Sequence, residues 1–332
     1  MGQWQPDVLG DGYEQLRIPL GDDPDGQGVV ESVLVRRVVR DDETVRAAVL
    51  YVHGFSDYFF QRELADFFAE RGFAFHAVDL RKSGRSRAPE HTAHYVTDLA
   101  LHEVELDEAL AIVRSSYPEA PVLLVSHSTG GLVVPLWVDH LNRRPGGAAA
   151  AGISGMVLNS PWFDLQLPTW QRLIATALVR ALSHVVPGRV IALPAGSYGA
   201  SLHVDSGGEW TYDLDMKPLD GCPVTYGWLA AVRRGQARLH RGLSIGLPVL
   251  VLHSTASRYV AGPADADVAD VVLDVRQIAR WSSSLGTDVT TVPVPHARHD
   301  VFLSSPAVRA EAYAAVDVWL RSRRLVDVRT DR

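Results

Sequence analysis

A serine flanked by small residues follows an apolar run in the middle of the chain. Residues 126–130 read Ser-His-Ser-Thr-Gly and come directly after the run 121–125. This order is typical of a nucleophile elbow, where a strand turns sharply into a helix and presents a hydroxyl at the turn. The turn needs small residues two positions before and after its centre, here Ser126 and Gly130. The usual first residue is glycine, so Ser126 departs from the pattern. The segment predicts Ser128 as a nucleophile, and an ordinary Ser/Gly-rich turn is the alternative.

A serine hydroxyl needs a base that removes its proton and a carboxylate that orients the base. Two histidines, His296 and His299, lie just after the last predicted strand. His299 is favoured because it directly precedes Asp300 and an apolar run, and His296 is the alternative. Behind a nucleophile elbow, the order along the chain is nucleophile, acid, histidine. A metal site is not indicated, because the two histidines have no further ligand at a recognisable spacing.

The first half of the chain supplies groups that could stabilise a developing negative charge. Residues 50–55 form a strand-like run that ends in His-Gly-Phe. The backbone N–H of Phe55, together with that of Thr129, would form an oxyanion hole. We expect His53 to be a structural hydrogen-bonding residue. The loop 79–86 contains glycine but lacks the Gly-Lys-Ser/Thr order of a phosphate-binding loop, so a structural turn is expected there.

Composition narrows the class of protein. The 332 residues include 47% hydrophobic and 21% charged residues, with a net charge of −7 and one cysteine. The arginine pairs are scattered, which argues against nucleic-acid binding, and one cysteine excludes an intrachain disulfide. No run approaches the roughly 18 apolar residues of a membrane span, and residues 1–21 lack the apolar core of a signal peptide. We expect a cytoplasmic protein without integral membrane association; the oligomeric state is left open.

Strand-like and helix-like segments alternate along the chain, which is typical of a mostly parallel sheet with helices on both faces. The expected strands are 31–38, 47–52, 73–79, 121–126, 154–160, 247–253 and 288–294. The expected helices are 58–71, 96–116, 129–142, 274–285 and 305–323. The Gly/Asp cluster 21–28 resembles a calcium loop but lacks its glutamate, so we expect a hairpin turn.

Residues 161–245 interrupt this alternation. They contain an apolar helix around 170–182 and a polar one around 227–240, with Gly/Pro-rich segments between. We interpret them as a cap inserted into a core formed by residues 1–160 and 246–332. Trp162, Trp170 and Trp228 are candidates for lining a substrate pocket beneath the cap. The alternative is that these aromatic residues form a small core of the cap itself.

Taken together, these motifs resemble the α/β-hydrolase superfamily, and within it the monoacylglycerol-lipase and lysophospholipase-like branch of the serine aminopeptidase S33 type. The resemblance extends over about residues 30–322 and is carried by the motifs 53–55, 79–86, 126–130, 158–162 and 299–300. It implies an α/β-hydrolase fold with a cap, no cofactor, and a serine hydrolase that cleaves carboxylic esters of hydrophobic or lipid-like substrates through an acyl-enzyme.

The position of the carboxylate that would orient the histidine departs from the family pattern. Members usually follow the strand at 249–252 with a short loop containing D-x-V-V-D, whereas here residues 253–259 contain no carboxylate. The same spacing returns at 270–274, so the resemblance implies Asp270 as the acid. Asp274 is the alternative, and Asp265 and Asp267 are less favoured.

Two other classes of function remain open. An acyltransferase or a thioesterase would use the same three side chains and differ only in the acceptor or the ester. A non-catalytic ligand receptor on this fold need not keep serine, histidine and both oxyanion donors together. An epoxide hydrolase or a dehalogenase would need a carboxylate in place of Ser128. We expect a small hydrophobic ester as the partner.

Overall fold

In the computed structural model, residues 2–192, 197–258 and 263–325 are described. They form a nine-stranded sheet in the order β1-β2-β3-β5-β4-β6-β7-β8-β9. The strands are β1 (Gln5–Pro6), β2 (Tyr13–Asp22), β3 (Val29–Arg37), β4 (Ala47–Val52), β5 (Phe73–Asp79), β6 (Val122–His127), β7 (Ile153–Asn159), β8 (Val249–Ser254) and β9 (Val289–Val294). The strands from β5 to β9 in this order run parallel, and β1, β2 and β3 are antiparallel to their neighbours.

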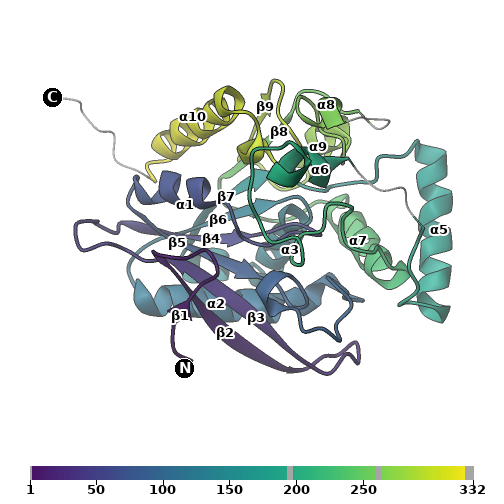
Figure 1. Cartoon of the computed structure of the whole chain (residues 1–332), viewed down its shortest axis with the longest axis horizontal. Helices are drawn as coiled ribbons and strands as arrows, with labels where there is room; N and C mark the ends of the chain where they lie inside the picture. The colour runs from purple at the N-terminus through teal and green to yellow at the C-terminus, as the bar shows by residue number, and fades with distance from the viewer. Residues whose placement is uncertain (1, 193–196, 259–262, 326–332) are drawn as a thin grey trace.

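Helices cover both faces of the sheet, as the sequence predicts. The longer helices are α1 (Arg62–Ala69), α2 (His102–Ser116), α3 (Gly130–Leu141), α5 (Thr169–Val185), α7 (Tyr226–Leu239), α9 (Val275–Ser282) and α10 (Pro306–Ser322). Short helices are α4 (Gly147–Ala150), α6 (Tyr198–Leu202) and α8 (Pro263–Ala266). Figure 1 shows α1 and α10 on one side of the sheet and α2 on the other.

Alternate residues of each central strand enter two separate cores, because side chains of a strand point to opposite faces. In β4, Leu50 belongs to the core beneath α2 and α3, whereas Val49 and Tyr51 belong to the core beneath α1 and α10. Both faces of β4 are fully buried. This double burial explains why its sequence reads as a continuous apolar run.

Two predicted turns are confirmed. The cluster 21–28 closes a hairpin in which Asp22 of β2 pairs with Val29 of β3. The loop 79–86 is a structural turn: Asp79 accepts a hydrogen bond from the backbone N–H of Phe59 at 3.0 Å and forms an ion pair with Arg85 at 2.8 Å.

The first two predicted helices are shorter than expected. Residues 58–61 are not helical, because Tyr58 and Phe60 pack against Tyr212 and Leu202 of the segment between β7 and β8. The second helix begins at His102 and not at residue 96, since a 3₁₀ turn precedes it. At residues 58–61, tertiary packing overrides the local helical pattern.

The segment that we call the insertion, residues 161–245, contains α5, α6 and α7. Both of its predicted helices are present, with α5 packed against α7 and α7 packed against α3. Figure 1 shows α5 at the periphery, beyond α7. In the described ranges, no helix has the length and apolar character that crossing a membrane requires.

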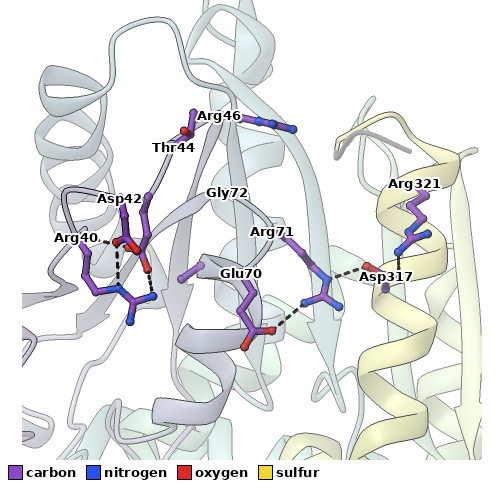
Figure 2. Close-up of a pocket in the computed structure, with 11 residues that line it drawn as sticks. Arg40, Asp42, Thr44, Arg46, Glu70, Arg71, Gly72, Asp317 and Arg321 are labelled. Atoms are coloured by element: carbon purple, nitrogen blue, oxygen red, sulfur yellow. Dashed lines mark hydrogen bonds and ion pairs between the residues drawn. The ribbon is translucent and has the colours of Figure 1, made fainter. Parts of the chain in front are cut away.

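A groove of about 670 Å³ lies at the amino ends of β4 and β5. Figure 2 shows several ion pairs along this groove, with Asp317 of α10 between Arg71 and Arg321. Arg40 is likewise paired with Asp42. Because these opposite charges pair with one another within the chain, the groove has no excess of one sign of charge that would attract a charged ligand.

Buried His76 of β5 generates a prediction about stability. Burial lowers the pKa of His76 from 6.5 to about 4. Between these pH values the unfolded chain binds a proton that the folded protein does not, so the free energy of unfolding decreases as the pH falls. We expect His76 to lower the free energy of unfolding by about 3 kcal/mol between pH 6.5 and pH 4.

We expect His76→Phe to reduce the loss of stability between pH 6.5 and pH 4 in urea unfolding. The exposed His184 of α5 offers a control, since His184→Gln should leave the pH dependence unchanged. Identical slopes for wild type and His76→Phe would contradict this interpretation.

Candidate active site

Ser128 lies at a sharp turn between β6, which ends at His127, and α3, which begins at Gly130. Its φ angle is +52°, in the left-handed region that non-glycine residues seldom adopt. A Cβ atom on Gly130 would lie 2.5 Å from the carbonyl oxygen of His53. The predicted elbow is therefore present, and its glycine is required by the close approach of β4.

Three of the predicted residues form a continuous hydrogen-bonded chain. His299 Nε2 lies 3.0 Å from Ser128 Oγ, and His299 Nδ1 lies 3.0 Å from Asp270 Oδ2. All three side chains are buried. An ionised carboxylate only accepts hydrogen bonds, so Asp270 favours the tautomer that carries its proton on Nδ1. The lone pair of Nε2 is then directed at the serine hydroxyl, which is the arrangement of a general base.

Asp270 is held in place by backbone groups. Its Oδ1 accepts hydrogen bonds from the N–H groups of Val272 and Leu273 at 2.8 and 2.7 Å. Its own N–H donates to the carbonyl of Ala256, and its carbonyl accepts from the N–H of Arg258. These contacts leave Oδ2 for His299.

The other candidate carboxylates have different partners. Asp274 caps the amino end of α9 by accepting from the N–H of Arg276. Asp265 forms an ion pair with Arg258, and Asp267 with Arg298. Among the four carboxylates considered, the structure brings Asp270 to the histidine.

His296 is exposed in the turn after β9, with φ at +56°. His299 is 2% exposed and reaches inward from the following loop. The distances to Ser128 and Asp270 therefore belong to His299, the favoured candidate for the base.

The two predicted oxyanion donors border one small hollow beside Ser128. Phe55 and Thr129 line it together with Gly54, Val133 and Trp228, and its volume is about 20 Å³. In the part of the chain that the structure describes, no protein acceptor is recorded for the backbone N–H of Phe55 or of Thr129. Two free donors beside a serine hydroxyl are suited to binding an oxyanion.

His53 has the structural role that the sequence predicts. Its Nε2 accepts a hydrogen bond from the backbone N–H of Leu80 at 3.0 Å, and its Nδ1 lies 2.7 Å from the carbonyl of Gly54. Burial lowers the pKa of His53, which keeps the ring neutral. It fixes the loop after β4, residues 53–58, which we call the β4 loop.

A second set of buried polar groups, not found from the sequence, lies behind His299. The carboxylate of Asp57 contacts His127 Nδ1 at 3.2 Å and Lys217 Nζ at 2.6 Å. Burial alone would raise the pKa of Asp57, but Lys217 and His127 outweigh it and hold this pKa well below its ordinary value. The ring of His127 lies 4.9 Å from that of His299. Asp57 lies close to His53 in the sequence and could have been considered. No local pattern indicates that Lys217, 160 residues away, is its partner.

The three tryptophans take different positions. Trp228 is buried against Phe55, with ring centroids 3.9 Å apart, and Trp162 packs on Trp228. The backbone N–H of Trp162 donates to the carbonyl of Ser128 at 3.0 Å. Trp170 is 64% exposed on α5, on a face that also exposes Leu173. It does not line the hollow described here.

Solved structures with the same fold include lipases and esterases. A soluble variant of monoglyceride lipase from Saccharomyces cerevisiae superposes with a TM-score of 0.65 at 17% identity, covering 99% of this chain and 96% of that one. The monoacylglycerol lipase of Paleococcus ferrophilus gives 0.61 at 22% identity, with 85% and 96% covered. A thermostable carboxyl esterase from Bacillus coagulans gives 0.62 at 16% identity, with 94% and 98% covered. These identities establish the fold alone.

A search of curated proteins finds no match. The sequence model of the serine aminopeptidase S33 family, in contrast, matches residues 43–306, which include the elbow, Asp270 and His299. This range is well over half of the chain. The protein is therefore a hydrolase that belongs to the serine aminopeptidase S33 family and has the α/β-hydrolase fold.

Proposed function

We propose that this protein is a serine hydrolase that cleaves carboxylic esters of hydrophobic or lipid-like substrates through an acyl-enzyme. The observation that carries the proposal is the chain of hydrogen bonds from Ser128 through His299 to Asp270. A serine with a positive φ angle, a histidine in hydrogen-bond contact with its hydroxyl and a buried carboxylate together have the geometry of nucleophilic acyl transfer.

In the proposed reaction, His299 Nε2 accepts the proton of Ser128 as Oγ attacks the ester carbonyl. The negative charge that develops on the carbonyl oxygen is stabilised by the N–H groups of Phe55 and Thr129. The alcohol leaves with a proton from His299, and a water activated by the same nitrogen hydrolyses the acyl-enzyme. Asp270 holds the ring and stabilises its charged form. The chemistry needs no cofactor.

The preference for hydrophobic esters rests on the lining of the hollow beside Ser128. Phe55, Leu80, Val133 and Trp228 supply apolar surface next to the two donors. At about 20 Å³ the hollow is smaller than an acyl chain, so a substrate must displace side chains around it. We propose that the insertion is a cap, and that Trp228 and Trp162 contact the acyl or alcohol part of the substrate.

The nucleophile and the base can be tested with paired variants. Ser128→Ala and His299→Ala should each lower kcat for a p-nitrophenyl ester by about 10³-fold or more, because the members of the chain act as a unit. The exposed His296 provides the control, since His296→Ala should retain activity. Labelling of wild type but not Ser128→Ala by a fluorophosphonate would support the assignment. Substantial turnover by folded Ser128→Ala would rule it out.

The acid can be tested with two neighbouring aspartates. Asp270→Asn should lower kcat by about 10²- to 10⁴-fold with little change in KM, because the amide favours the wrong histidine tautomer. Asp274→Asn keeps a helix cap, because asparagine caps about as well as aspartate, so kcat and stability should both stay close to wild type. Steady-state kinetics and thermal unfolding separate the two. Equal, mild effects on kcat would place the acid elsewhere.

The substrate class can be tested by varying the acyl chain from two to twelve carbons. Each buried methylene contributes about 0.8 kcal/mol, so kcat/KM should rise about fourfold per methylene until the pocket is full. Trp228→Leu should move the optimum to longer chains, whereas Trp170→Leu should leave the profile unchanged. A flat profile, or one that is highest at acetate, would contradict the apolar pocket.

A further inference from the structure

Four consecutive residues of the β4 loop each contact one stretch of the insertion, residues 213–228. The side chain of Phe55 packs on Trp228, with centroids 3.9 Å apart. Ser56 Oγ accepts a hydrogen bond from the N–H of Cys222 at 2.9 Å, Asp57 forms an ion pair with Lys217 at 2.6 Å, and Tyr58 OH accepts from the N–H of Asp213 at 2.8 Å. The insertion thus contacts the loop that carries the Phe55 donor at every position from 55 to 58.

The contact between Lys217 and Asp57 is the charged one of these four. Both side chains are almost fully buried, and Lys217 Nζ lies within 6 Å of the ring centres of Phe60, Tyr198 and Tyr212. A buried charge cannot exchange its partner for water at low cost, so the ion pair fixes the distance between its two segments.

Asp57 also connects to the elbow, because its second oxygen contacts His127, the residue before Ser128. Ser56 has a φ angle of +54°, a conformation that the loop adopts only when its surroundings hold it. One carboxylate therefore joins three segments: the insertion, the loop of one oxyanion donor and the strand end that carries the nucleophile.

We propose that Lys217 is a positioning residue, which holds the N–H of Phe55 at the reacting carbonyl through its buried ion pair with Asp57. This role rests on the proposed function and extends it, because the insertion then sets the rate of the chemical step as well as the choice of substrate. A shift of a donor by about 1 Å can lower the rate by about 10²-fold. Loss of the pair therefore acts on kcat.

The test is steady-state hydrolysis of p-nitrophenyl butyrate by Lys217→Met. We expect kcat to fall at least 10-fold while KM changes less than threefold. A trifluoromethyl ketone, whose adduct with Ser128 carries an oxyanion, should lose affinity by the same factor as kcat/KM. Unchanged kcat, or a higher KM with unchanged kcat, would overturn the proposal.

Arg172→Met is the matched control. Arg172 also forms a buried ion pair within the insertion, with Asp164 at 3.0 Å, and Asp164 keeps a second partner in Arg233. Arg172 has no recorded contact with the β4 loop among the described residues. Its kcat should stay within about twofold of wild type. A loss equal to that of Lys217→Met would mean that any damage to the insertion lowers kcat, which would overturn the proposal.

The double variant Asp57→Asn with Lys217→Met covers the case in which Lys217→Met fails to fold. It leaves no unpaired buried charge, so we expect it to fold, with kcat still at least 10-fold below wild type. Recovery of wild-type kcat would show that the low kcat of Lys217→Met comes from the unpaired charge of Asp57 and not from loss of the ion pair, which would overturn the proposal. Fluorophosphonate labelling of wild type distinguishes failure of the proposed function from failure of this inference. If wild type is not labelled, the proposed function is refuted. If wild type is labelled but Lys217→Met has wild-type kinetics, only the role of Lys217 is refuted.

Discussion

The ends of β4 and β6 approach each other so closely that side chains are excluded between them. A Cβ atom on Gly54 would lie 2.9 Å from the Cβ of Ser128, and one on Gly130 would lie 2.5 Å from the carbonyl oxygen of His53. Glycine at both positions lets the two backbones meet. This contact places the N–H groups of Phe55 and Thr129 beside one hydroxyl, and the strained turn at Ser128 is held by the same packing. The rest of the site is arranged around this point.

The parallel sheet brings the remaining groups to the same edge. The loops after β4, β6, β8 and β9 carry Phe55, Ser128, Asp270 and His299 respectively, and parallel strands end at one edge of a sheet. The charged groove lies at the opposite ends of β4 and β5, where Asp317 of α10 forms an ion pair with Arg71. The candidate active site and the charged groove therefore lie at opposite ends of the parallel strands. The fold explains where reactive groups can gather, and the side chains determine which reaction they perform.

Local patterns predicted much of this site. The elbow, the donor after His53 and the histidine before Asp300 are each specified by a few adjacent residues, and the strand predictions agree with the structure to within a few residues. Residues 58–61 were predicted as helix because nothing local shows that Tyr58 and Phe60 pack on the insertion.

The sequence alone likewise does not show which face of α5 turns inward. This helix is apolar around much of its circumference, and only its contact with α7 determines that Trp170 points to solvent. The pairing of Asp57 with Lys217 also depends on tertiary structure. No sequence period relates two charges that are 160 residues apart.

Asp270, the proposed acid, comes later in the chain than the family pattern places it, and its contacts show which parts of the site can vary in position. The N–H of Asp270 donates to the carbonyl of Ala256, and its carbonyl accepts from the N–H of Arg258, so Asp270 lies beside the chain that directly follows β8. The entropic cost of closing a loop grows slowly with its length, so a longer connection between β8 and Asp270 lowers stability only slightly once its ends are joined. The geometry at His299 requires only that a carboxylate oxygen reach Nδ1. The spacing from strand to acid can therefore vary, whereas the two glycines where β4 meets β6 cannot, since no rearrangement of a loop makes room for a side chain between two backbones.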